Sequence, residues 1–277
     1  MRAAVGVGAR HDETLGATRY FLTVTRTLAA AQFKLRYLDS TLSYLWTVAR
    51  PLAFFGVLYV FFTKVTNFGD NVANYAVYLL AGVVLWTYFA EATATALYSL
   101  VHNESLVRKL PMPRAAIPFA VVLTSLLDLC LNMVAVLALV LASGIAPRPG
   151  WLELPLLVGI LTILVAGVSL TLSVLYVRFR DLGQIWMVAT QALFYATPIF
   201  YVVSSLGGGT RILLLVNPLA PLFTEMRHAL IDPTAPTAAE AIGGSEWLLV
   251  PLGVIVLVTA TGILLFRREA PGAAELL

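Results

Sequence analysis

Residues 75–100 read YAVYLLAGVVLWTYFAEATATALYSL, a run of 26 positions whose only charged side chain is Glu91. An α-helix rises about 1.5 Å per residue, so about 20 residues cross a hydrocarbon core that is about 30 Å thick. Within lipid, each backbone N–H and C=O group must find a partner inside its own segment, which favours a helix. This stretch therefore predicts a membrane-spanning helix.

Five further apolar runs reach a similar length. They cover residues 42–63, 118–143, 155–177, 183–203 and 247–266. The chain is 60% hydrophobic and only 12% charged, whereas a soluble domain is about 25% charged. The sequence therefore predicts an all-α integral membrane protein with six transmembrane helices. We expect one domain over residues 1–277, made of a cytoplasmic segment (1–41), a six-helix bundle (42–266) and a cytoplasmic tail (267–277).

The placement of basic residues predicts the orientation. Of the 18 Lys and Arg residues, 14 precede or enter the first run, lie between runs two and three or runs four and five, or follow the sixth run. Because cytoplasmic loops collect Lys and Arg, both termini are expected in the cytoplasm. The net charge of +3 is explained by this asymmetry and indicates no nucleic-acid partner.

An amphipathic helix is predicted over residues 19–38, before the first run. Its apolar residues recur at helical spacing with Arg26, Lys34 and Arg36 between them, a pattern typical of a helix in the cytoplasmic membrane interface. A soluble amphipathic helix is the alternative. Arg50 lies inside the first run, where it could snorkel to the interface or face a pore. The expected contacts with lipid headgroups are made by Arg26, Lys34, Arg36 and Arg50.

Between the fifth and sixth runs lies an outer segment, residues 204–246, that is rich in Gly and Pro. Within it, residues 212–216 and 219–230 are apolar but too short to span. We expect two short helices there that re-enter the outer leaflet or cap it.

Polar and aromatic side chains inside the runs suggest a pore. Glu91 and Asp128 are carboxylates at bilayer depth, where charges are rare and often functional, although interhelical hydrogen bonding is an equal alternative. The aromatic residues could line a path for sugars, or could anchor and pack the bundle. The predicted pore-lining residues are Phe55, Tyr59, Phe62, Glu91, Gln191, Tyr195 and Tyr201.

Several kinds of site are missing from the sequence. None of the three lysines (Lys34, Lys64, Lys109) follows a glycine, so there is no G-x-x-x-x-G-K-[ST] loop for ATP phosphates. No metal-ligand cluster and no Ser/His/Asp set can be recognised, and the single cysteine, Cys130, is expected to pack as a small apolar residue. We therefore expect no catalytic residue, metal or cofactor on this chain.

Three stretches carry a resemblance to a known family. The first is FKLRY at residues 33–37 with LSYLWT at 42–47, the second is NESLVRKLPMPR at 103–114, and the third is VRFRDL at 177–182 running on to TPIFY at 197–201. Together they resemble the permease subunit of type-2 ATP-binding-cassette exporters, in the subgroup that exports lipid-linked polysaccharides such as O-antigen, capsule, teichoic acid and galactan. Met112 stands where the family commonly has an aromatic residue, and Thr197 where it often has Ser.

The resemblance implies a homodimer in the bacterial inner membrane, with a pore between spans one, two and five. It also implies two copies of an ATPase subunit that holds ATP and Mg²⁺, and a lipid-linked oligo- or polysaccharide as cargo. The expected ATPase-docking residues are Asn103, Glu104, Leu106, Arg108, Lys109, Pro113, Arg114, Arg178, Arg180 and Asp181, and Asp181 could also cap the fifth span. Ordinary positive-inside charge is the alternative reading of these loops.

Two other functions stay open at this point. A drug or small-lipid exporter of the same superfamily would share the layout. A membrane-embedded glycosyl or phosphate transferase is a less favoured alternative, because the cytoplasmic loops are basic and lack the acidic motifs that bind divalent metals.

Overall fold

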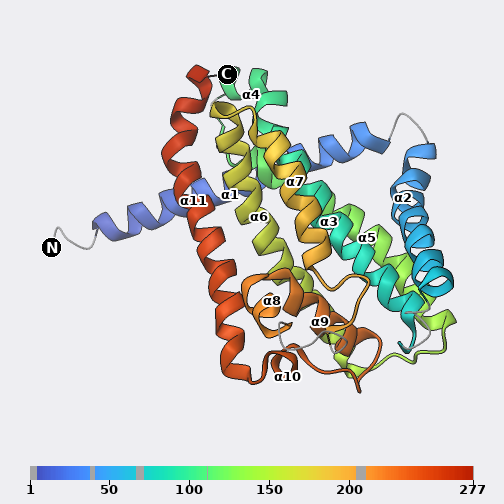
Figure 1. Cartoon of the computed structure of the whole chain (residues 1–277). Coiled ribbons are helices and arrows are strands. Elements are labelled where there is room, and N and C mark those ends of the chain that lie inside the picture. The colour runs from blue at the N-terminus through green and yellow to red at the C-terminus, as the bar shows by residue number, and fades with distance from the viewer. Residues whose placement is uncertain (1–4, 38–40, 67–71, 111, 204–209, 277) are drawn as a thin grey trace.

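The computed structural model describes the chain except for residues 1–4, 38–40, 67–71, 111, 204–209 and 277 (Figure 1). Every regular element in the described part is a helix. Five of these helical segments are long and apolar enough to cross a membrane. They are α2 (Thr41–Val60) with the π-helical turn η1 (Phe61–Val65), α3 (Tyr75–His102), α5 (Ala116–Ala142), α6 (Leu154–Arg178) and α11 (Leu249–Leu276). The prediction of an all-helical membrane protein is confirmed.

The fifth predicted run is different. A single helix was expected over residues 183–203, but α7 (Leu182–Ala196) has 15 residues and ends before Thr197. Pro198 has no N–H to donate, and its ring disfavours helical geometry at the preceding residue. Thr197 accordingly adopts φ −102° and ψ 136°. At about 22 Å, α7 is shorter than the hydrocarbon core, so the expectation of one continuous helix through residue 203 is corrected.

The backbone beyond α7 is irregular, but three of its carbonyl groups accept hydrogen bonds from side chains of α3. The Tyr78 hydroxyl, on α3, donates a hydrogen bond to the carbonyl oxygens of Pro198 and Tyr201, the latter at 2.6 Å. The Tyr75 hydroxyl donates to the carbonyl of Phe200 at 2.8 Å. Irregular backbone at membrane depth is tolerated where protein groups satisfy it. The two tyrosines of α3 therefore make the break in α7 possible.

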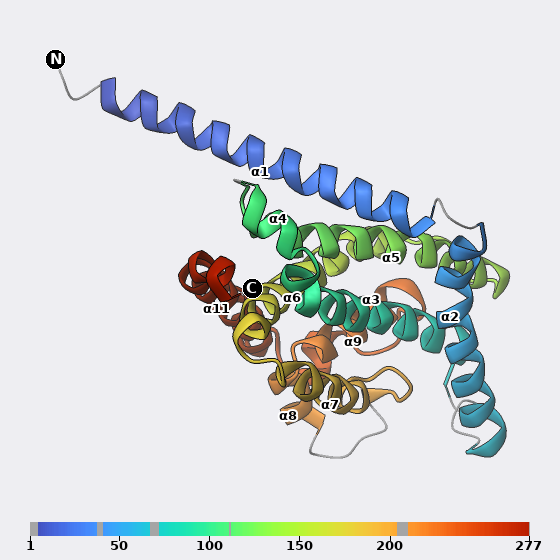
Figure 2. The same cartoon turned by 90° about the horizontal axis from the view of Figure 1, so that it is seen from above.

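Helix α3 is the centre of the bundle and α2 is its edge. The most apolar window of α3 is 78% buried, whereas that of α2 is only 6% buried. Figures 1 and 2 show α3 among α5, α6 and α7, with α2 on the outside of the bundle. The apolar surface of α2 is therefore left for lipid or for another protein.

Helices α6 and α11 cross at two glycines. A Cβ atom on Gly262 would lie 2.3 Å from the Gly167 carbonyl oxygen, and one on Gly167 would lie 2.6 Å from the Thr259 Cα atom. Small residues at such crossings allow helix backbones to approach closely in membrane bundles. This crossing fixes α11 on the side of α6 that Figure 1 shows at the edge of the molecule.

The N-terminal helix α1 (Val5–Tyr37) is longer than the predicted segment 19–38, whose last residue lies outside the described part. It runs alongside α5 (Figure 2). Phe21 packs edge-on against Phe119, with ring centroids 5.6 Å apart, and Arg36 forms an ion pair with Asp128. The helix is therefore held on the bundle by both apolar and charged contacts.

The two ends of the bundle are closed by short elements. The segments predicted as short helices over residues 212–216 and 219–230 are helical, as α8 (Thr210–Val216) and α9 (Leu219–Leu230). Near them in the chain or in space lie α10 (Ala238–Ile242) and two 3-10 turns, η3 (Pro149–Glu153) and η5 (Ser245–Leu248). At the opposite end, α4 (Glu104–Lys109) lies beside the C-terminal end of α11 (Figure 1). Residues 267–276, expected as a tail, continue α11 as helix, with Ala270 and Ala273 buried.

The glycine crossing generates a first prediction. Gly262→Ala should lower the thermal midpoint of the purified permease, because the new methyl group overlaps the α6 backbone; overpacking of this kind costs about 1–3 kcal/mol. Gly253→Ala is the matched control on the same helix, since no atom lies within 4 Å of its Cβ position. Equal midpoints for the two variants would contradict the crossing.

The hydrogen bonds across the α7 break generate a second prediction. Tyr78→Phe should destabilise the permease by about 1–3 kcal/mol, the cost of leaving buried carbonyl groups without a donor. Tyr88→Phe is the control, because Tyr88 binds the Thr162 hydroxyl, which also donates to the Val158 carbonyl. Thermal unfolding in detergent measures both variants, and a loss in Tyr88→Phe as large as that in Tyr78→Phe would argue against this account.

Candidate functional site

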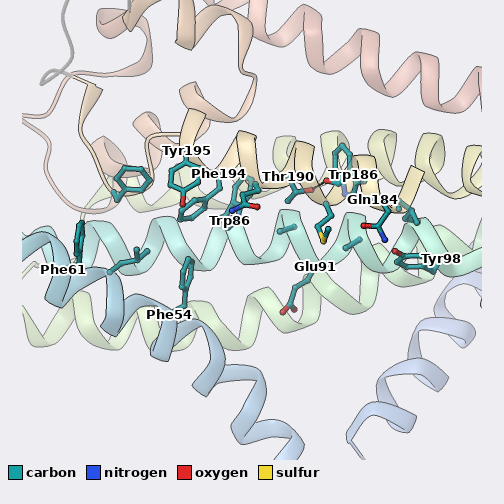
Figure 3. Close-up of a pocket in the computed structure, with 18 of the residues that line it drawn as sticks. Phe54, Phe61, Trp86, Glu91, Tyr98, Gln184, Trp186, Thr190, Phe194 and Tyr195 are labelled. Carbon is teal, nitrogen blue, oxygen red and sulfur yellow. Dashed lines mark hydrogen bonds between the residues drawn. The ribbon is translucent and has the colours of Figure 1, made fainter. Parts of the chain in front are cut away.

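A cavity of about 920 Å³ lies between α2, α3 and α7 (Figure 3). We call it the aromatic cavity. Its aromatic lining residues are Phe54, Phe61, Phe62, Trp86, Tyr98, Trp186, Phe194, Tyr195 and Phe200. Pockets of this size hold organic ligands and are usually apolar with a few polar groups. The cavity is therefore the main candidate site on the membrane part of the chain.

The rings of the aromatic cavity support one another. Phe62 stacks on Phe200 with centroids 5.0 Å apart, and the Trp86 and Phe194 centroids lie 5.4 Å apart. Tyr195 remains 60% exposed, and Figure 3 shows it on α7 above Phe194. Such a wall offers flat apolar faces that can contact the C–H groups of a ligand without fixing it at one position.

Polar groups in the cavity are few. Glu91 lies on α3, and Gln184, Thr190 and Gln191 lie on α7. The Trp186 indole N–H donates to the Thr93 hydroxyl at 3.2 Å, which holds this ring against α3. The cavity can therefore accept and donate hydrogen bonds at a small number of positions along a mainly aromatic wall.

The structure brings four of the seven predicted pore-lining residues to this cavity, namely Phe62, Glu91, Gln191 and Tyr195. Three lie elsewhere. Phe55 and Tyr59 lie against each other, with centroids 5.6 Å apart, and pack on the bundle core. The Tyr201 hydroxyl donates to the Tyr195 carbonyl at 3.3 Å.

The face of α2 that reaches the cavity carries Phe54, Leu58 and Phe61. These residues recur at helical spacing, as do the predicted Phe55, Tyr59 and Phe62. The two stripes are one residue apart, so spacing alone could not choose between them. The cavity is also lined by Trp86, Trp186 and Phe194, which were not among the predicted pore-lining residues. Their apolar runs predicted only that they lie on helices.

Two ion pairs connect predicted headgroup residues to carboxylates inside the bundle. Arg36 on α1 pairs with Asp128 on α5, and Arg50 on α2 pairs with Glu91 on α3, the latter with 3.0 Å between Nη1 and Oε1. Arg26 and Lys34 are exposed on α1. In the structure, two of the four predicted headgroup residues therefore bind protein carboxylates.

The predicted docking residues gather at the end of the bundle where α4 lies. Asn103 joins α3 to α4, and its side-chain amide donates to the Ser99 carbonyl at 2.8 Å. Arg108 pairs with Glu104 at 3.1 Å along the exposed side of α4, where Lys109 is also exposed. Leu106 is half-buried. This short helix thus presents charge outward and is attached directly to the central helix.

An apolar cluster joins α4 to the other helices at this end. Val107 is buried with Leu100, Ile117 and Phe266, and Ala270 belongs to the same cluster. Pro113 is half-buried in the turn before α5. The Arg114 guanidinium donates to the Ala270 carbonyl rather than projecting away from the protein. The C-terminal part of α11 therefore braces the loop that carries α4.

The second predicted docking loop connects α6 to α7. Arg178 lies 4.0 Å from Glu269 of α11, and the Arg180 guanidinium lies 5.3 Å from the centre of the Tyr176 ring. Asp181 is exposed at the position before α7, but its side chain makes no capping hydrogen bond, so the expected cap is corrected. Arg178, Arg180 and Asp181 remain accessible on the face that α4 shares.

The outer segment is held by its own polar contacts. The Thr234 hydroxyl donates to Asp232 at 2.6 Å and holds the pKa of that carboxyl below its usual value, with a smaller contribution from Arg227 at 3.8 Å. The backbone N–H of Thr237 donates to Glu240 and lowers the pKa of that carboxyl in the same way. Both carboxylates are therefore ionised at neutral pH, as capping and pairing require.

Two further kinds of site concern metal ligands and the single cysteine. Among the described residues, no three His, Cys, Asp or Glu side chains are grouped so that they could hold a metal ion. Cys130, expected to pack as a small apolar residue, lies exposed on α5.

Comparisons with known proteins agree with this arrangement. The family model described as "ABC-2 type transporter" matches residues 23–231. Two proteins from Klebsiella pneumoniae, each named O-antigen export system permease protein RfbA, are 27% and 25% identical over 259 residues, which is 93% of this chain and 96% of each relative. A protein of the same name from Myxococcus xanthus is 26% identical over 87% of this chain and 91% of its own length. The chain therefore belongs to the ABC-2 type transporter family.

Proposed function

We propose that this chain is the permease subunit of an ATP-driven exporter that moves a lipid-linked polysaccharide across the bacterial inner membrane. The observation that carries the proposal is the aromatic cavity between α2, α3 and α7, in a chain similar to O-antigen export permeases. Its rings can follow the C–H faces of successive sugars, whereas a drug or small-lipid exporter would favour a smoother aliphatic wall. As a member of a transporter family, the chain is a transport subunit rather than an enzyme.

The energy for transport comes from a partner. The sequence holds no phosphate-binding loop, and the family implies a separate ATP-binding subunit. In our proposal, two such subunits, each with ATP and Mg²⁺, bind below α4 and the loop between α6 and α7. Arg108, Lys109, Arg178 and Arg180 supply the positive charge that acidic groups of the ATPase would meet.

A second copy of the chain completes the conduit. Only 6% of the most apolar window of α2 is buried, and α7 exposes apolar residues such as Met187 (60%) and Val188 (65%). Exposed apolar faces of this kind mark interaction surfaces or lipid contacts, and most oligomers of one chain are two-fold symmetric. We place the symmetry axis so that the two aromatic cavities face it. In this arrangement α7 and its irregular extension form the fifth of six spans, both termini are cytoplasmic, and α8 and α9 re-enter the outer leaflet.

The basic side of α1 would guide the lipid headgroup. Arg26 and Lys34 are exposed, and basic residues near the membrane surface attract anionic lipids by about 1 kcal/mol each. Arg36 and Arg50 already bind carboxylates. We therefore assign the contact with headgroup phosphates to Arg26 and Lys34 rather than to Arg36 and Arg50.

The first test of this function is depletion of the chain in its own cell. We expect finished lipid-linked polymer to accumulate on the inner leaflet, because the polymer is made inside and its conduit is missing. The measurement compares binding of a glycan-specific probe to intact and permeabilised spheroplasts, with a plasmid-borne copy of the chain as the control. Normal surface polymer in depleted cells would refute polysaccharide export, and altered drug sensitivity alongside it would favour the small-molecule exporter.

The second test concerns the docking face. Arg108→Glu with Lys109→Glu should weaken binding of the ATPase subunit at least about tenfold, since like charges placed together at an interface cost several kcal/mol. Affinity is measured by co-purification and titration in detergent. Lys64→Glu reverses an exposed charge at the other end of the bundle and should leave binding unchanged. If the double variant binds and stimulates the ATPase normally, α4 is not the docking element.

A further inference from the structure

A second cavity adjoins the aromatic cavity and is chemically different from it. It has a volume of about 310 Å³ and is lined by Arg36, Trp46, Thr47, Arg50, Glu91 and Asp128. These six residues define what we call the charged compartment, and they come from α1, α2, α3 and α5. Glu91 lines both cavities. The charged compartment therefore opens beside the aromatic path.

The compartment is neutral overall. Its two arginines are matched by its two carboxylates, in the pairs Arg36–Asp128 and Arg50–Glu91. A phosphate or diphosphate would have to compete with a carboxylate for each arginine, and at Arg36 it would separate the arginine from Asp128, whose side chain is only 10% exposed. This balance disfavours an anionic ligand and favours an uncharged polar one.

Hydrogen-bonding capacity remains in the compartment after the pairs are made. A guanidinium has five N–H donors and a carboxylate has about four acceptor sites, while the Arg50–Glu91 pair joins one nitrogen to one oxygen. The Arg50 and Glu91 side chains are 72% and 43% exposed. The Asn132 side-chain oxygen lies beside Glu91 and Asp128 in a small adjoining pocket, is buried, and has no hydrogen-bond partner among the described residues.

The position of Glu91 along α3 requires polar surroundings for its carboxylate. Glu91 lies 11 residues before the end of α3 at His102, a distance of about 16 Å along the helix. Charged side chains at such depth face water or polar partners rather than hydrocarbon. The accessible side of the compartment must therefore be filled by water or by a ligand rich in hydrogen-bonding groups.

An aromatic ring completes the set. Trp46 is 60% exposed at the rim of the compartment. A flat indole beside arginine and carboxylate groups matches a sugar ring, whose C–H face packs on the indole and whose hydroxyls exchange hydrogen bonds with both kinds of charged group. The volume of about 310 Å³ is at the low end of the range for ligand pockets, about 300–1,000 Å³, and suits one sugar unit rather than a chain of them.

We propose that the charged compartment is a sugar-binding subsite that holds one sugar unit of the lipid-linked substrate before it reaches the aromatic cavity. The inference rests on the proposed function, and it adds that this permease itself distinguishes a glycosylated lipid from the bare carrier lipid. Arg50 and Glu91 bind hydroxyl groups, and Trp46 packs against the ring.

The test uses the full-length permease in lipid nanodiscs. The probes are a prenyl diphosphate alone and the same lipid carrying a single glucose, galactose, N-acetylglucosamine or rhamnose. The unaltered protein should bind at least one glycosylated probe about tenfold more tightly than the bare lipid. Trp46→Ala should reduce this ratio to below about threefold and leave the affinity for the bare lipid unchanged, while Trp46→Phe should retain part of the preference.

Control variants separate the subsite from general damage. Trp247→Ala removes an exposed tryptophan at the opposite end of the bundle and should keep the full preference. Glu91→Gln should also lose the preference, and its thermal midpoint shows whether the protein is still folded. Trp46→Ala does not touch either ion pair, so it remains informative if Glu91→Gln does not fold.

Two outcomes would overturn the inference. Equal affinity of the unaltered protein for all the probes would mean that the permease does not recognise the sugar. The second outcome is that Trp46→Ala or Glu91→Gln weakens binding of the bare diphosphate lipid and leaves the preference unchanged. The compartment would then bind the diphosphate headgroup rather than the sugar. Either result can occur while depletion still blocks polymer export, so failure of the subsite is distinct from failure of the proposed function.

Discussion

In a bilayer, backbone N–H and C=O groups must find their partners within the protein, and this requirement explains why one helix organises the others. Helix α7 stops at Ala196 because of Pro198, which leaves several carbonyl groups without helical partners. Tyr75 and Tyr78 of α3 donate to three carbonyls beyond α7, and the Asn217 side-chain amide donates to the Ala196 carbonyl. The same helix carries Trp86 and Glu91 into the aromatic cavity. Helix α3 therefore both supports the irregular part of the cavity wall and forms much of its surface.

The charged side chains obey a related constraint. Removing one partner of an ion pair inside a bundle leaves an uncompensated charge, which is strongly destabilising. Arg50–Glu91 and Arg36–Asp128 connect α2 to α3 and α1 to α5. Only 6% of the most apolar window of α2 is buried, and Arg50 lies one helical turn before Phe54, so the Arg50–Glu91 pair lies on the face of α2 that lines the cavity.

The sequence predicted what depends on local properties. Run length and apolar content identified five long helices, and short apolar runs identified α8 and α9. It failed where distant residues decide. Phe54 rather than Phe55 lines the cavity, one helical turn after Arg50, which pairs with Glu91, 41 residues away in the chain. Arg114 was expected to face a partner, but it binds Ala270 because α11 continues as a helix where a tail was expected. The Thr197-Pro198 pair could have indicated the end of α7 at Ala196, but the continuous apolar run through residue 203 led to the prediction of one helix.

The distribution of packing suggests how a force applied at α4 would reach the cavity. Val107 of α4 is buried with residues of α3, α5, α6 and α11, so these helices move with α4. Helix α2 lies outside that cluster, and within α7 only Phe194 is buried. A displacement of α4 would therefore shift α3 relative to α2 and α7, which are the two other walls of the aromatic cavity. The loosely packed helices are thus the ones that must part for a polymer to pass, while the well-packed ones transmit the motion.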